Sequence, residues 1–206
     1  MPRVAGRIDA AKNEAILDAA LELLGERGFD VSLEEIARRA GVSKQTIYNH
    51  FGPKTEVVRA LAARRAASIA APLGAAQAAE PPERTLAAYG VALLEGVLSD
   101  RSLGIMRFAI ASASTTPELA EAICQAGVRG SRAHLADFLA LEDAAGRLRV
   151  PDPAAAAEMY AGMVIGSLQT AFLLGARAEI GSDEIAAKAT AAAQRFVSAF
   201  GPALVP

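Results

Sequence analysis

The chain has 206 residues, a formal net charge of −2 at pH 7 and one cysteine, Cys124. That length accommodates one large domain or a small head with a larger body. A single cysteine excludes an intramolecular disulfide and a multi-cysteine metal cluster. The first residues do not form a charged segment followed by an apolar one, so we expect a cytoplasmic protein.

The composition favours helices. Alanine supplies 49 residues and is the strongest helix former, while strand-type alternation is hard to find, so we expect an all-α protein. Residues 1–70 carry a net charge of +2 and residues 71–206 a net charge of −4. The asymmetry is mild, but a positive N-terminal part suits a polyanionic partner, because the position of charges matters more than their sum.

The first predicted helix spans residues 9–27. Its apolar stripe consists of Ile16, Ala20, Leu23 and Leu24. Gly28 is expected to end the helix in a left-handed conformation, with Phe29 making the accompanying hydrophobic contact.

A capping box predicts the start of a second helix. In Ser32-Leu33-Glu34-Glu35 the serine can accept from the Glu35 amide while Glu35 reaches back to the Ser32 amide. The apolar stripe that follows consists of Leu33, Ile36, Ala37 and Ala40, at helical spacing. Gly41 is expected to stop this helix.

A third short helix follows, with Ser43 as its N-cap. At about 100° per residue, Ile47 and Phe51 fall on one side and can anchor the helix to a core. Gln45 and Asn49 then point away from that core. Thr46 and Tyr48 flank them, with Lys44 and His50 on the rims. This outward face suits base edges and phosphates.

Two short helices joined by a glycine-containing turn form a helix-turn-helix. The run GFDVSLEEIARRAGVSKQTIYNHFGPKTEVVRAL, residues 28–61, closely resembles the N-terminal head of the tetracycline-repressor (TetR) family. Ser32 stands where the family often has threonine, and Gly52-Pro53 is one of several tolerated versions of that turn. The resemblance implies a three-helix DNA-binding head.

Nine residues are predicted to contact DNA. Gln45 and Asn49 are the expected base readers, because an amide can pair with adenine through two hydrogen bonds. Thr46 and Tyr48 are expected at phosphates or at a thymine methyl. The phosphate candidates are Ser32, Ser43, Lys44, His50 and Lys54. The alternative for each is a solvated surface residue. Arg3 and Arg7 could form an arm for the minor groove, although a disordered tail is the simpler interpretation.

The rest of the chain continues as helices. The predicted spans are 53–70 with Pro53 as first residue, 83–98, 103–113, 117–146 with Thr116 as N-cap, 153–175 with Asp152 as N-cap, and 183–200 with Ser182 as N-cap. Gly127 and Gly130 could bend or break the longest of these. The total is about nine helices. We expect a DNA-binding domain over 1–52, a connecting helix over 53–70 and an effector-binding and dimerisation domain over 71–206.

The stretch Met159–Ala176 contains no charged residue, so a membrane-spanning helix has to be considered. Its glycines and polar residues favour instead a helix buried in a core or an interface. In the TetR family the last two helices of each subunit pair in a dimer. The resemblance therefore implies a homodimer, with expected interface residues Gly166, Phe172, Phe196 and Phe200. Ordinary core positions are the alternative for each.

The family resemblance also implies regulation by a small molecule that binds the body and lowers DNA affinity. We expect a mainly apolar pocket with polar anchors. The lining candidates are Met106, Arg107, Phe108, His134, Met159, Tyr160 and Met163, each with a core role as the alternative. A symmetric dimer would place two recognition helices in successive major grooves and read a palindromic operator, and repression is the expected effect.

An enzyme is the first rival hypothesis. The sequence has no phosphate-binding loop, dinucleotide glycine pattern, nucleophile elbow or zinc-protease motif, and it contains two histidines, so no cofactor and no catalysis are expected. The second rival is a DNA-binding protein without small-molecule control.

Overall fold

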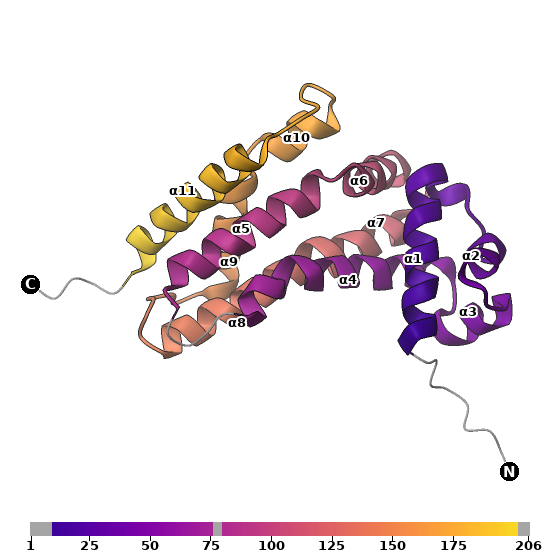
Figure 1. Ribbon diagram of the computed structural model, residues 1–206, viewed down its shortest axis with the longest axis horizontal. Coiled ribbons are helices and arrows are strands. Elements are labelled where there is room, and N and C mark those ends of the chain that lie inside the picture. The colour runs from indigo at the N-terminus through magenta and orange to yellow at the C-terminus, as the bar shows by residue number, and fades with distance from the viewer. Residues whose placement is uncertain (1–9, 76–79, 202–206) are drawn as a thin grey trace, which may run out of the picture. The chain divides into compact units, whose positions relative to one another are not determined.

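The computed structural model describes residues 10–75 and 80–201, apart from the side chain of Phe29. Every element in these ranges is a helix, as the composition predicted (Figure 1). The elements are α1 (Ala10–Arg27), η1 (Gly28–Asp30), α2 (Leu33–Ala40), α3 (Lys44–Phe51), α4 (Lys54–Ala75), α5 (Pro82–Leu98), α6 (Asp100–Ser112), α7 (Pro117–Ile123), η2 (Cys124–Arg129), α8 (Gly130–Ala144), α9 (Pro153–Ile165), α10 (Leu168–Leu173) and α11 (Ser182–Phe200).

The chain forms two compact units. Among the described residues, those up to Arg64 and Asp100–Gly127 make one unit, named the head unit, and those of Arg65–Ser99 and from Val128 onward make the other, the body unit. The division runs through α4, so this helix contributes its first half to the head unit and its second half to the body unit. Helices α6 and α7 belong to the head unit although they lie far from it in the sequence.

The core of the head unit contains the apolar residues that the sequence predicted for the first three helices. All four residues of the expected α1 stripe are buried, and Val31, Ile36 and Ile47 have no exposed surface. Val57, Val58 and Leu61 add the first half of α4 to this core. Ala109, Leu119 and Ile123 supply the contributions of α6 and α7, which no local pattern announces.

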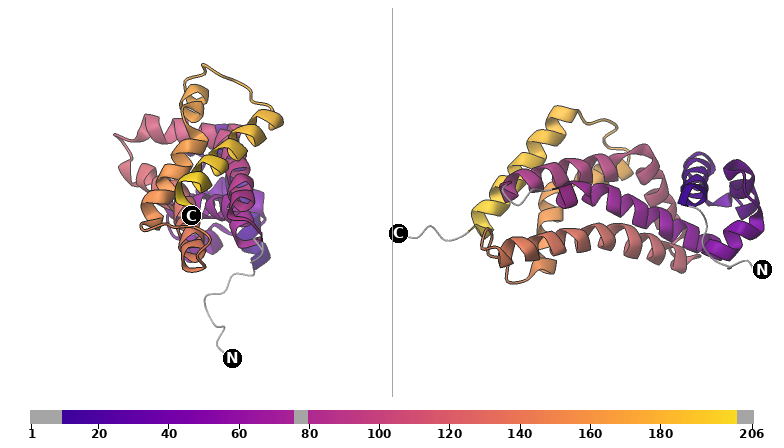
Figure 2. Two further views of the ribbon diagram at one scale, coloured as in Figure 1. Left: turned by 90° about the vertical axis from the view of Figure 1, so that its left-hand side faces the viewer. Right: turned by 60° about the horizontal axis from the view of Figure 1, so that its bottom comes forward.

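The body unit is built around α5, which packs against α9, α10 and α11 (Figure 1; Figure 2). Tyr160 lies fully buried and donates a hydrogen bond from its hydroxyl to the Leu86 carbonyl at 2.6 Å. Its ring meets that of Phe196 edge-on, with centroids 5.3 Å apart. Gly90 permits the close approach of α11, because a Cβ there would lie 2.9 Å from that of Ala189. Burial raises the pKa of the Tyr160 hydroxyl well above its usual range, so this group acts as a neutral donor.

Two of the long predicted helices are interrupted. The span 117–146 consists of α7 and α8 joined by the π-helical turn η2, which contains Gly127, one of the two glycines expected to disturb it. The span 153–175 breaks at Gly166, whose φ of 52° is left-handed and ends α9. The break was not predicted, since glycine in a helical pattern does not by itself announce a positive φ.

The predicted helix starts are partly right. Asp152 caps α9, with its carboxylate accepting from the Ala155 amide at 3.0 Å. Thr116 is the N-cap of α7, as predicted, although its side chain makes no capping hydrogen bond. The prediction of Ser182 as N-cap is wrong, because Gly181 is the N-cap of α11. Pro53 precedes α4 and is not its first residue. Among the residues that the structure describes, no helix is both long and apolar enough to cross a membrane.

Candidate nucleic-acid interface

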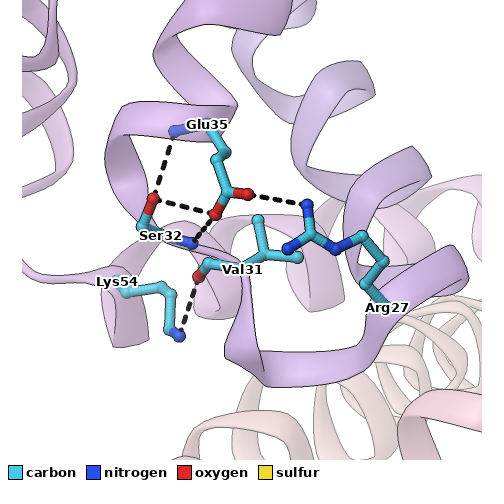
Figure 3. Close-up of polar contacts among 5 residues, drawn as sticks. All are labelled: Arg27, Val31, Ser32, Glu35 and Lys54. Atoms are coloured by element: carbon cyan, nitrogen blue, oxygen red, sulfur yellow. Dashed lines mark hydrogen bonds and ion pairs between the residues drawn. The ribbon is translucent and has the colours of Figure 1, made fainter.

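The start of α2 is held by the predicted capping box. The Ser32 hydroxyl accepts from the Glu35 amide at 3.2 Å, and the Ser32 amide donates to Glu35 Oε2 at 2.8 Å (Figure 3). Arg27, the last residue of α1, donates to the other Glu35 oxygen at 2.6 Å. These contacts lower the pKa of Glu35 from 4.5 to about 2, chiefly through the Ser32 amide and then through Arg27. Glu35 therefore joins the end of α1 to the start of α2.

The turn between α2 and α3 follows the prediction closely. Gly41 ends α2 with a left-handed φ of 67°, and the Val42 amide donates to the Ala37 carbonyl at 3.0 Å. Ser43 caps α3 by accepting from the Thr46 amide at 3.0 Å. Three local features thus fix the geometry of a helix-turn-helix: the capping box at Ser32, the left-handed Gly41 and the Ser43 cap.

The third helix presents two unlike faces. Ile47 is fully buried and Phe51 is packed against the head core, as predicted. On the opposite side Tyr48 is 58% exposed, and an open hollow in the surface is lined by Ser43, Lys44, Gln45 and Tyr48. Asn49 and His50 are exposed as well, and Thr46 is half-buried. Ser43, Lys44, Gln45 and Tyr48 therefore lie together on the outward side of the helix-turn-helix.

Several of these polar groups already have partners within the protein. Gln45 donates to the Asn49 carboxamide oxygen at 2.6 Å, so the two expected base readers are bonded to each other. Lys44 forms an ion pair with Glu34, and His50 lies 3.2 Å from the Asn13 side-chain oxygen. Binding of another molecule at this face would exchange these contacts for new ones. Glu34 and Asn13 were not singled out from the sequence, because they lie ten or more residues from their partners.

Ser32 and Lys54, two of the predicted phosphate contacts, are placed differently. The Ser32 amide and hydroxyl both donate to Glu35, so neither hydrogen points outward. The Lys54 ammonium is half-buried and donates to the Val31 carbonyl at 3.0 Å (Figure 3). Burial lowers the pKa of Lys54, and the nearby carboxylates of Asp30 and Glu35 act in the opposite sense. Arg3 and Arg7, the predicted arm, lie outside the described residues.

The seven predicted effector residues are divided between the two units. Met106, Arg107 and Phe108 belong to α6 in the head unit, where Phe108 packs against the head core. His134 lies exposed on α8, and Met159 and Met163 are 54% and 37% exposed on α9. Tyr160 is buried and bonded within the body core. Neither unit by itself brings the seven residues together.

The four predicted interface residues are not all on the surface. Phe172 is 5% exposed and Phe196 has no exposed surface, so both belong to the core of their own protomer. Phe196 is buried because the apolar stripe of α11, which also includes Ile185 and Ala189, faces α5 and α9. Phe172 belongs to α10, which packs against α5. Phe200 stacks on Phe196 with ring centroids 4.5 Å apart, while Gly166 is exposed.

Comparison with known proteins identifies the class to which this fold belongs. The sequence profile described as "Bacterial regulatory proteins, tetR family" matches residues 16–61, and the profile described as "AefR-like transcriptional repressor, C-terminal domain" matches residues 84–202. The second match covers more than half of the chain. The protein is therefore a member of the TetR family of helix-turn-helix transcriptional regulators, a class of DNA-binding proteins and not of enzymes.

Individual relatives agree with this assignment. A TetR transcriptional regulator from Agrobacterium tumefaciens is 26% identical, with a TM-score of 0.75 over 95% of this chain and 97% of the other. The flavonoid-responsive regulator FrrA is 26% identical, with a TM-score of 0.71 over 95% of this chain and 100% of the other.

The curated relatives are similar over part of the chain. The uncharacterized HTH-type transcriptional regulator TtgW from Pseudomonas putida is 45% identical over 53 residues, which is 25% of this chain and 40% of that protein. The chain spans less than half the length of the curated relatives that it matches.

Proposed function

We propose that the protein binds a DNA operator by inserting α3 into the major groove. The observation that carries this proposal is the exposed face of α3, where Gln45, Tyr48 and Asn49 lie opposite the buried Ile47. Amide side chains recognise base edges, and Lys44 with the hydroxyls of Ser43 and Thr46 suits the flanking phosphates. The protein acts as a cytoplasmic transcriptional regulator.

A single head offers few contacts, so binding as a homodimer to a palindromic operator is part of the proposal. The faces of α9 and α11 that are exposed on the protomer are the proposed dimer contacts. On α9 this face includes Met159 and Met163 with Gly162 and Gly166, and exposed methionines beside glycines suit close packing of helices. Of the four interface residues predicted from the sequence, the proposed interface keeps Gly166 and Phe200. Met159 and Met163 take the place of Phe172 and Phe196, which are buried in the protomer.

Repression relieved by a small, mainly apolar effector completes the proposal. Its support is the match of residues 84–202 to a repressor C-terminal domain and the similarity to a regulator named as flavonoid-responsive. Such control requires the effector to bind the DNA-free state more tightly than the DNA-bound state. The alternative is a regulator without an effector.

A mobility shift with DNA from upstream of the protein's own gene tests these points, with and without a panel of apolar compounds. A shift that one compound releases supports a ligand-controlled repressor. A shift that no compound releases favours the alternative. If no shift appears, selection from random DNA sequences shows whether any operator exists, and failure there would refute the proposed DNA binding.

A further inference from the structure

Glu34, in the first turn of α2, places a carboxylate beside the third helix. It forms an ion pair with the ammonium of Lys44, which is the first residue of α3. The Glu34 side chain is 61% exposed, and its second oxygen, Oε2, has no hydrogen-bond partner among the residues that the structure describes. An accessible hydrogen-bond acceptor on α2 therefore lies at the N-terminal end of α3.

The next residue, Glu35, is placed differently. Both of its oxygens are bonded within the head unit, to Ser32 and to Arg27, and they hold the start of α2. Successive side chains leave a helix about 100° apart, so Glu34 leaves α2 in another direction, toward Lys44. Glu34 is thus available to another molecule, whereas the carboxylate of Glu35 is engaged in the capping box.

The N-terminal end of α3 is the end at which a recognition helix contacts base edges. A carboxylate accepts hydrogen bonds and is repelled by phosphates, so the partner that DNA can offer to Glu34 is the amino group of a base. The hollow in the surface lies at the same end of α3, and it is lined by Ser43, Lys44, Gln45 and Tyr48.

Two bases present an amino group in the major groove. Cytosine presents this donor without an acceptor, whereas in adenine the amino group lies beside the acceptor N7. Because a carboxylate is itself only an acceptor, cytosine is the better partner for Glu34. The exchange also releases Lys44 to a phosphate. On DNA without this cytosine the ion pair breaks without compensation, and the carboxylate repels the backbone.

We propose that Glu34 is a specificity-determining residue, which accepts a hydrogen bond from the amino group of a cytosine in each half of the operator. This inference rests on the DNA-binding role proposed above. It identifies one base pair of the operator and adds a residue of α2 to the base readers on α3.

Selection of random double-stranded DNA by the full chain tests the assignment. The wild type should select a motif with a cytosine at one position of each half-site. Glu34→Gln keeps the size of the side chain but removes its charge. This variant should lose that cytosine, with adenine as the expected replacement because an amide pairs with adenine. Lys44→Met should retain the cytosine, since the carboxylate and not the ammonium reads it. A cytosine that persists in Glu34→Gln would overturn the inference.

Affinities for two duplexes provide a second readout. Changing the selected cytosine to thymine, which presents an acceptor instead of a donor, should weaken binding of the wild type about tenfold and that of Glu34→Gln less than about twofold. Glu26→Gln removes the same charge from an exposed residue of α1 and is the control, which should discriminate like the wild type. Equal discrimination by wild type and Glu34→Gln would overturn the inference and leave the proposed function intact. A wild type that selects no motif would refute the proposed function, and this inference with it.

Discussion

Tyr48 is the large side chain that α3 leaves outside the head core, with 58% of its surface exposed. Replacing it by alanine should remove contacts to DNA without creating a cavity. We expect Tyr48→Ala to weaken operator binding by about 10- to 100-fold, in line with about 1–3 kcal/mol for a good groove contact. A binding titration measures this, with circular dichroism confirming the helical fold.

Leu141→Ala is a suitable control for that variant. Leu141 lies on α8 and is 67% exposed, so its truncation is as harmless to the core as that of Tyr48. It should bind the operator like the wild type. Equal affinities for wild type and Tyr48→Ala would refute the assignment of α3 as the recognition helix.

Glu35 links the stability of the head to pH. Its pKa lies at about 2 in the folded protein and at 4.5 ordinarily, so folding favours the ionised form. The stabilisation is fully present above pH 4.5 and is lost as the pH falls toward 2. Between pH 4.5 and pH 2 the free energy of unfolding should therefore decrease less in Glu35→Gln than in the wild type.

Urea titrations at a series of pH values measure the effect of Glu35. Arg27→Met removes one cause of the lowered pKa and leaves the bonds from Ser32. This variant should give a pH dependence between those of the wild type and Glu35→Gln. A Glu35→Gln profile parallel to that of the wild type from pH 4.5 downward would contradict the role of the capping box.

At the scale of elements, the end of α2 depends on one backbone conformation. Gly41 has a φ of 67°, and no atom lies within 4 Å of the place that a Cβ would take, so only conformational strain opposes a side chain there. Gly41→Ala should cost about 1 kcal/mol of unfolding free energy. Gly104, in α6, is equally open but has no positive φ. Gly104→Ala should stabilise the protein by about 0.5–1 kcal/mol. Denaturant titrations measure the change in unfolding free energy of both variants, and a change of the same sign in the two would contradict this account.

The contact between α5 and α11 depends on the small side chains that let the two helices approach closely, and not on a strained backbone conformation. A Cβ on Gly90 would lie 2.9 Å from the Ala189 Cβ and 3.1 Å from the Tyr160 hydroxyl oxygen. Gly90→Ala should therefore destabilise the body unit by about 1–3 kcal/mol. Adding Ala189→Gly removes the nearer of these atoms, so the double variant should be more stable than the sum of the two single effects. Strict additivity in urea unfolding would argue against this close approach.

At the scale of the whole molecule, the proposed dimer places Met159 and Met163 between protomers. Introducing charge at both positions should leave the protomer folded, because both side chains are exposed, but should separate the subunits. We expect the Met159→Glu, Met163→Glu variant to sediment as a monomer at micromolar concentration. Leu141→Glu, on another exposed apolar side chain, is the control and should remain dimeric. A double variant that stays dimeric would exclude this face.

Sequence reasoning succeeded where structure is local. The caps at Ser32 and Ser43, the left-handed Gly41 and the burial of Ile47 all depend on residues within one or two turns of each other. The same reasoning left Phe196 open between an interface and the core, and the structure buries it against Tyr160. An apolar stripe shows that a helix face is covered, but the covering surface lies elsewhere in the chain.

The sequence by itself determined the all-α class and the helix-turn-helix, because helix propensity, caps and apolar periodicity are properties of neighbouring residues. The family followed from the resemblance of residues 28–61 to the TetR head. Only the tertiary structure decided that residues 100–127 join the head unit, and that Lys54 faces Val31. It also decided that Tyr160 and Phe196 belong to the body core. These outcomes depend on contacts between residues distant in sequence, and the free energy of burying a side chain is set by the surface that packs against it.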